Sequence, residues 1–265
     1  MTRRFLNILT AELSKTKSTS AVLIALFAVA FTTFLVLTNY NLDIQSIVSI
    51  GQNPWFRIIE LSNSILAFFV ITPTVILIIS ALAFIEQKAD SWKLLYTLPI
   101  SRGQILISRL SIIILLIVSI LFTLCITIYL SASFLDWRFP EIEFSFYSCD
   151  LTYLLNHLAH TFISLLGLIG IQLFLSYFFK NVIPALSIGF FGFIFGFLLT
   201  AGNQKLALYN PYNYSMITQD LKMIRYEHNN IIFGSWITNV ELNSIICFSI
   251  FLLLTFALEK HKNIK

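Results

Sequence analysis

Two histidines are the residues whose spacing most resembles a metal-binding or catalytic pair. His157 and His160 stand three residues apart in the segment NHLAH, so both fall on one face of a helix, and Asp150 lies nearby in the sequence. Imidazole and carboxylate groups are common zinc ligands. A third firm ligand and a neighbouring general base are not evident. We therefore favour a polar collar at the end of a helix and keep a metal-dependent or enzymatic role for the pair as the alternative.

Other signatures of chemistry are missing from the sequence. It contains no phosphate-binding Walker A segment, nucleophile elbow or HExxH helix. The three cysteines are too few for a disulfide framework. Cys125 and Cys247 lie in apolar runs and are interpreted as small packing residues, whereas Cys149 lies in a polar loop. We expect no catalytic residue, cofactor or metal in this chain.

The amino-acid composition indicates whether the chain folds in water or in a membrane. Hydrophobic residues make up 57% of the 265 residues and charged residues 11%, and the mean hydropathy is +0.84. Soluble chains carry about 25% charged residues. The same figures exclude a disordered chain, a collagen, a coiled coil and a disulfide-rich secreted domain. The sequence therefore predicts an integral membrane protein.

Six apolar runs are long enough to cross a bilayer, which requires about 20 residues per helix. They predict an all-α polytopic membrane protein that forms one transmembrane domain over residues 1–265, with spans near 20–38, 61–85, 105–133, 156–179, 182–200 and 243–258. The polar stretch from Glu12 to Ser20 argues against a cleaved signal peptide. No span carries a charged residue in its interior. Ion-coupled transporters usually have ionisable residues there, which bind and release the coupling ion. Energy for any uphill transport is therefore expected from outside the membrane.

The basic residues predict the orientation of the spans. Twelve of the seventeen Lys and Arg residues fall on the side of the two termini, together with four of the thirteen acidic residues. The two sides then carry net charges of +8 and −4. Because positive residues collect on the cytoplasmic side, we expect both termini there.

Two cytoplasmic segments have helical patterns of their own. Residues 1–19 place apolar side chains at spacings of three and four between basic ends, which predicts an interfacial amphipathic helix, with a frayed basic tail as the alternative. Residues 86–98 predict a second short helix, which Pro99 ends. Its apolar side is formed by Trp92, Leu94, Leu95 and Leu98. Such a face suits docking into a groove of another protein or lying flat on lipid, and both interpretations stay open.

The second segment and its flanks resemble the membrane subunits of ABC-2-type ABC transporters, which are exporters. The matching residues are Glu86, Leu94, Leu95, Pro99, Ser101 and Arg102. Arg109 stands where lysine is usual, and Asp90-Ser91-Trp92 replaces the common Gly-Thr. Residues 11–18 are similar to the interfacial helix of that family, so the resemblance covers the whole chain. Within the family, DSWKLLYTLPISR is most similar to permeases of bacteriocin and lantibiotic self-protection.

This resemblance implies a function and a set of partners. The chain would be the permease of an ATP-driven exporter in the bacterial inner membrane, paired with a second copy or a paralogue. Two cytoplasmic ATPase subunits would bind ATP and Mg²⁺, and each would receive a helix 86–98 in a cleft, with Glu86 and Arg102 anchoring its ends. No nucleic acid partner is expected. The cargo is left open among peptide antibiotic, lipid, polysaccharide, drug and sodium ion, with an amphipathic or hydrophobic molecule favoured. A passive channel is a further alternative.

Glycines on the fifth span predict a close helix contact. Gly189, Gly192 and Gly196 lie along this span, and the last two form a GxxxG motif. The resemblance implies that spans one and five line the dimer seam, so these glycines are predicted there, with packing inside one chain as the alternative. Gly167 and Gly170 form a smaller step on the fourth span.

Three further signals concern breaks in the spans. Pro73 is expected to kink the second span and leave a backbone carbonyl for neighbours to satisfy. Residues 208–228 are expected to form a short re-entrant or interfacial helix before the last span. The pairs Asn53-Pro54 and Asn210-Pro211 are interpreted as loop punctuation.

Overall fold

A computed structural model describes residues 10, 12–14, 16, 20–42, 53–88, 102–202, 204–222, 226–227, 230–231 and 237–261. Within these residues, six helical segments are long and apolar enough to cross a membrane. They comprise α2 (Ala21–Leu42), α4 (Pro54–Ile65) continued by the π-helix η1 (Leu66–Val70) and α5 (Ile71–Lys88), α7 (Arg102–Arg138), α8 (Leu151–Phe178), α9 (Val182–Gly202) and α12 (Asn239–His261). The predicted all-α polytopic fold is confirmed.

Several helices extend beyond the predicted spans. The second span begins at Pro54, and α7 has 37 residues, which is about 55 Å of helix against a hydrocarbon layer of about 30 Å. The Asn53-Pro54 pair explains why the second span begins where it does, and Asn210-Pro211 plays the same part at the 3-10 turn η4 (Pro211–Asn213). Asn53 accepts a hydrogen bond from the Trp55 amide, and Asn210 accepts one from the Tyr212 amide. Each pair therefore starts a helix as an N-cap followed by proline, and loop punctuation understates its role.

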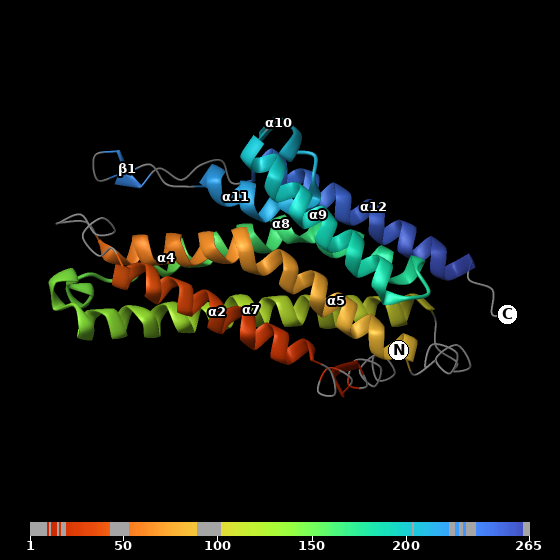
Figure 1. Cartoon of the computed structure of the whole chain (residues 1–265), viewed down its shortest axis with the longest axis horizontal. Coiled ribbons are helices and arrows are strands. Elements are labelled where there is room, and N and C mark those ends of the chain that lie inside the picture. Colours follow the sequence, from red (N-terminus) through yellow and green to blue (C-terminus); the bar gives the residue numbers. More distant parts are fainter. Residues whose placement is uncertain are drawn as a thin grey trace.

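Short elements connect the spans. Two 3-10 turns, η2 (Pro140–Ile142) and η3 (Phe144–Phe146), follow α7. Before α12 come α10 (Gln204–Ala207), η4, α11 (Tyr214–Lys222) and an antiparallel pair of two-residue strands, β1 (Tyr226–Glu227) and β2 (Asn230–Ile231). In Figure 1 the green turns after α7 lie at the left end, while α10 and α11 lie nearer the middle. The indole nitrogen of Trp55 donates to the carbonyls of Phe144 and Tyr147, at 3.1 and 3.0 Å. This contact ties the start of α4 to the turns after α7.

Helix α8 lies at the centre of the bundle and packs along α12, α5 and α11. Its closest approach is to α12, because Gly167 and Gly170 lack side chains where α12 passes. A Cβ atom at Gly167 would lie 3.3 Å from the backbone of Ser244, and one at Gly170 would lie 3.0 Å from that of Phe248. The step predicted on the fourth span is therefore a packing surface within the chain.

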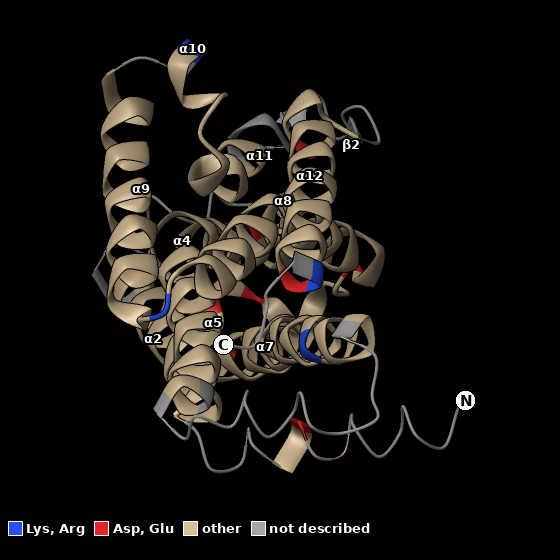
Figure 2. Cartoon of the chain, turned by 90° about the vertical axis from the view of Figure 1, so that its right-hand side faces the viewer, with Lys and Arg blue, Asp and Glu red and all other residues tan. Residues whose placement is uncertain are grey.

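Few Lys, Arg, Asp or Glu residues interrupt the apolar helices, as Figure 2 shows in a view along the bundle. Helices α2 and α9 form an outer side of the bundle and expose large apolar side chains. The exposed fractions of Phe27 on α2 and Phe191 on α9 are both 69%. Such residues suit contact with lipid or with another membrane protein.

Candidate functional site

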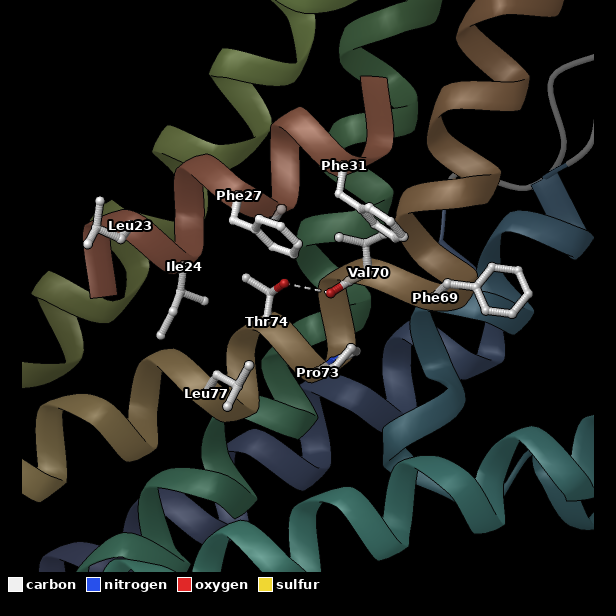
Figure 3. Close-up of a pocket in the computed structure, with 10 residues that line it drawn as sticks. Leu23, Ile24, Phe27, Phe31, Phe69, Val70, Pro73, Thr74 and Leu77 are labelled. Carbon is white, nitrogen blue, oxygen red and sulfur yellow. Dashed lines mark hydrogen bonds between the residues drawn. The ribbon is translucent and has the colours of Figure 1, made fainter. Parts of the chain in front are cut away.

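An apolar groove opens between α2 and the π-helix region of the second span (Figure 3). Its volume is about 420 Å³. The side chains of Leu23, Phe27 and Phe31 line it from α2, and Phe69, Pro73 and Leu77 line it from the second span. Thr74 also borders the groove, but its hydroxyl donates to the carbonyl of Val70 at 2.6 Å. The groove therefore presents hydrocarbon to any occupant.

The π-helix is explained by the proline that follows it. Pro73 has no amide hydrogen, and its ring would clash with the carbonyl four residues earlier in a regular α-helix. In η1 the amide of Ile71 instead donates to the carbonyl of Leu66, five residues back, which widens the turn. The distortion predicted around Pro73 is thus present as a π-turn on the wall of the groove.

A neighbouring segment exchanges hydrogen bonds with this distorted turn and with the start of α5. The hydroxyl of Ser215 on α11 donates to the carbonyl of Ala67 at 3.2 Å. The hydroxyl of Thr72 donates to the carbonyl of Tyr212 at 3.4 Å. We call residues 210–222 the outer segment, because the distribution of basic residues predicts that they lie on the outer side of the membrane. It contains the short helix α11, which agrees with the helix expected before the last span.

The outer segment also covers the glycines of α9. The amide of Asn213 donates to the carbonyl of Gly196 at 2.5 Å, and that of Asn210 donates to the carbonyl of Gly192 at 3.1 Å. A Cβ atom at Gly192 would lie 2.6 Å from the ring of Tyr212. One at Gly189 would lie 2.8 Å from Ile76 on α5. Packing inside one chain therefore accounts for all three glycines, and their place at a dimer seam stays a prediction.

His157 binds the outer segment to α8. Its Nδ1 atom lies 3.1 Å from Oε1 of Gln219, whose amide donates to the hydroxyl of Thr161 at 2.7 Å. The imidazole also meets the ring of Tyr153 edge-on, with centroids 4.5 Å apart. These contacts bury His157 between α8 and α11.

His160 binds the start of α12 to α8. Its Nδ1 atom donates to Oε1 of Glu241 at 2.5 Å. The other carboxylate oxygen accepts from the amide and the hydroxyl of Thr238, at 2.6 and 3.0 Å, and the Glu241 amide donates back to that hydroxyl at 3.3 Å. This is a capping box. Its signature, Thr-x-x-Glu, was visible in the sequence, but the pairing of its carboxylate with His160 was not.

The two histidines therefore have separate structural partners. In the described part of the chain, no group of three or more His, Cys, Asp or Glu side chains could hold a metal ion. The predicted polar collar is also incomplete as a description, because both imidazoles are buried, with exposed fractions of 5% and 7%. Inside the bundle, His157 links α8 to α11 and His160 links α8 to α12.

The predicted ATPase-docking helix lies largely outside the described residues. Glu86 is in the last turn of α5, and Arg102 is the first residue of α7. Trp92, Leu94, Leu95, Leu98 and Pro99 fall between these helices, in the part of the chain that is not described. The end of α5, the start of α7 and the end of α12 lie at the same end of the bundle (Figure 1). The docking residues stay a prediction.

Contacts near this end join α7 and α5 to the end of α8. The guanidinium of Arg109 lies over the ring of Tyr177, 4.8 Å from its centroid. The amide of Gln87 donates to the carbonyl of Phe179 at 3.5 Å. The two helices that bracket the predicted docking segment are thus both attached to α8.

The model of a family described as ABC-2 family transporter protein matches residues 8–196 of this chain, which is well over half of its length. No curated protein matches the chain in sequence.

Proposed function

The chain belongs to the ABC-2 family of transporter proteins, and from this membership we propose that it is the permease of an ATP-driven exporter. The match over residues 8–196 carries this proposal. The six apolar helices supply the membrane-spanning part of such a transporter. In this proposal ATP hydrolysis takes place in separate cytoplasmic subunits, which bind ATP and Mg²⁺.

We place the ATPase attachment at the segment between α5 and α7. Residues 86–98 carry leucines and Trp92 among charged side chains, which suits a groove in a partner. Glu86 and Arg102 bracket this segment at one end of the bundle. Both bracketing helices pack on α8 through the Gln87 and Arg109 contacts. Force applied to the segment would therefore reach the centre of the fold.

We place the pairing surface for a second permease on the exposed side of α2 and α9. The groove connects the two helices, since Phe69 lines it and its ring centroid lies 5.7 Å from that of Phe197 on α9. Large apolar residues along α2 and α9 face away from the chain. Pairing across this side would enclose two grooves between the subunits.

The groove supports a cargo with an extended apolar part. Its lining is hydrocarbon and aromatic, and the one hydroxyl at its edge is already bonded within its own helix. A bare inorganic ion would lose its hydration there without gaining ligands. We therefore propose an amphipathic or hydrophobic cargo, such as a peptide antibiotic, lipid or drug.

Co-purification and flux measurements test the proposal. The tagged chain is expressed together with an ABC ATPase from its own genome, sought first among the neighbouring genes, and inside-out vesicles are supplied with a fluorescent phospholipid or a labelled cationic amphipathic peptide. We expect the ATPase to co-purify and one of the probes to move only when ATP is hydrolysed. Flux without ATP would instead indicate a passive channel, and a chain that retains no ATPase would contradict the proposal.

A further inference from the structure

The outer segment is held firmly on two sides. Toward α9, Asn213 donates to the carbonyl of Gly196 at 2.5 Å and to the hydroxyl of Thr200 at 3.0 Å. Toward α8, Gln219 donates to Thr161 at 2.7 Å. These distances are short to normal for hydrogen bonds between neutral groups. The segment is therefore built to stay with α8 and α9.

On its third side the outer segment contacts the π-turn at Ala67 and the first turn of α5 at Thr72, through long hydrogen bonds. The hydroxyls of Thr72 and Ser215 lie 3.3 Å apart, Thr72 is 3.4 Å from the carbonyl of Tyr212, and Ser215 is 3.2 Å from the carbonyl of Ala67. Hydroxyl hydrogen bonds are strongest near 2.7–2.8 Å. These three contacts are longer than the hydrogen bonds that join the segment to α8 and α9, although both side chains are almost fully buried.

The π-turn also divides the second span into parts with different neighbours. The part before it, α4, packs mainly on α2 and α7, whereas the part after it, α5, packs on α9 and α8 as well as on α2. A π-turn inside a helix is a common functional site. Its wider hydrogen-bond register lets the two parts change their relative direction without unfolding. Such a change would move Ala67 and Thr72 past the outer segment.

We propose that the Thr72–Ser215 contact is a latch between the π-turn and the outer segment, closed in this structure and opened by ATP-driven movement. The latch rests on the proposed function, because an ATPase must supply the movement through α5. When it opens, Ser215 leaves Ala67 and Thr72 while Asn213 and Gln219 keep the outer segment on α9 and α8. The groove beside the π-turn then widens on its outer side.

Cysteine pairs test the latch directly. In a background in which the three native cysteines are replaced by alanine, Thr72→Cys and Ser215→Cys place two thiols where the hydroxyls are 3.3 Å apart, a separation compatible with a disulfide. The control pair is Gly167→Cys and Ser244→Cys, which joins α8 to α12, where no opening is proposed and where a Cβ at residue 167 would lie 3.3 Å from the Ser244 hydroxyl. Oxidation rates are measured by mass spectrometry in complexes with the ATPase, at rest and after trapping with ATP and vanadate.

At rest we expect the Thr72–Ser215 pair to cross-link readily. Trapping should slow this reaction about tenfold, as it would if nine complexes in ten held the latch open. The control pair should react at the same rate in both states. Equal rates for the latch pair in complexes that retain trapped nucleotide would overturn the latch, as would failure to cross-link at rest. Complexes that trap no nucleotide would contradict the proposed function on which the latch depends.

Discussion

The imidazole of His160 and the carboxylate of Glu241 form a hydrogen-bonded pair at 2.5 Å, although 81 residues separate them in the sequence. Glu241 is fully buried, and its second oxygen is occupied by Thr238. The pair therefore fixes where α12 begins relative to α8. It does so beside the histidine that holds the outer segment.

Removing one member of this pair should destabilise the protein. His160→Ala leaves the Glu241 carboxylate buried without its strongest partner, and breaking a buried pair in this way costs about 3–5 kcal/mol. Thermal unfolding in detergent should show a clearly lower Tm. Adding Glu241→Gln should recover part of the loss, because the amide oxygen still accepts from Thr238 without a buried charge. An unchanged Tm for His160→Ala would show that the pair contributes little.

The glycines of α9 provide a matched pair of substitutions. A Cβ at Gly196 would overlap the side chain of Asn213, whereas one at Gly202 would meet nothing within 4 Å. Gly196→Ala should therefore lower the free energy of unfolding by about 1–3 kcal/mol, as overpacking does. Gly202→Ala should change it by less than about 1 kcal/mol. Thermal unfolding and protease cleavage of the outer segment measure both variants, and equal behaviour would contradict the packing described for Asn213.

Cys149 reports both orientation and environment, because it lies outside the spans, between η3 and α8. Burial, and then the negative charge of Asp150, raises the pKa of its thiol. A raised pKa lowers the thiolate fraction, so labelling should be slow near neutral pH and should still increase above about 8.5. A membrane-impermeant maleimide should label intact cells at this residue in a background with Cys125 and Cys247 replaced by alanine.

Asp150→Asn isolates the charge effect on Cys149. Asp150 caps α8 by accepting from the amides of Thr152 and Tyr153, and asparagine caps helices equally well. The variant should therefore keep the helix start and label faster than the parent at the same pH. Labelling of the parent only after the membrane is opened would reverse the proposed orientation.

Narrowing the groove should reduce transport without loss of the ATPase. Leu23 lines the groove and is 69% exposed, whereas Leu253 on α12 is 71% exposed and lies elsewhere. Leu23→Trp should lower ATP-dependent probe flux several-fold, while Leu253→Trp should leave it near the parent value. ATPase co-purification is measured for both. Equal flux in the two variants would exclude the groove as the cargo path.

A charge reversal at the predicted docking segment should uncouple ATP hydrolysis from transport. Glu86→Lys changes the residue expected to anchor helix 86–98, so less ATPase should co-purify and probe flux should fall at least about tenfold, which corresponds to 1.4 kcal/mol of lost coupling. Glu60→Lys is the matched reversal at the other end of the same span. Glu60 pairs with exposed Arg57 at 3.2 Å, a contact of small energetic value. Normal flux in Glu86→Lys would contradict the docking role.

The sequence was sufficient for the spans because their signal is local and large. Each span is a continuous apolar run, and a bilayer accepts such a run only as a helix. The irregular turn near Pro73 was likewise predictable, since a proline cannot complete a regular turn. That it would take the form of a π-helix over Leu66–Val70 was not, because these five apolar residues carry no register signal of their own.

The polar contacts between distant elements were beyond sequence reasoning. Asn213, Gln219 and Glu241 read as ordinary loop or helix-end residues until the fold places them against Gly196, His157 and His160. Their partners are chosen by packing, and packing follows from the whole arrangement of helices. The same limit applied to the glycines of α9. Their motif indicates that another element packs closely on this helix, but it does not indicate which element.

The pairing of α8 with α12 has a consequence for biosynthesis. Ribosomes deliver the chain from its N-terminus, so α8 enters the membrane before its main partner exists. Until α12 arrives, His160 has no carboxylate, and the backbone at Gly167 lacks the hydroxyl of Ser244 that its amide contacts at 2.8 Å. Arrival of the last helix therefore completes the central packing. A chaperone or membrane protease that recognises the uncovered face of α8 could thus distinguish unfinished permeases from finished ones.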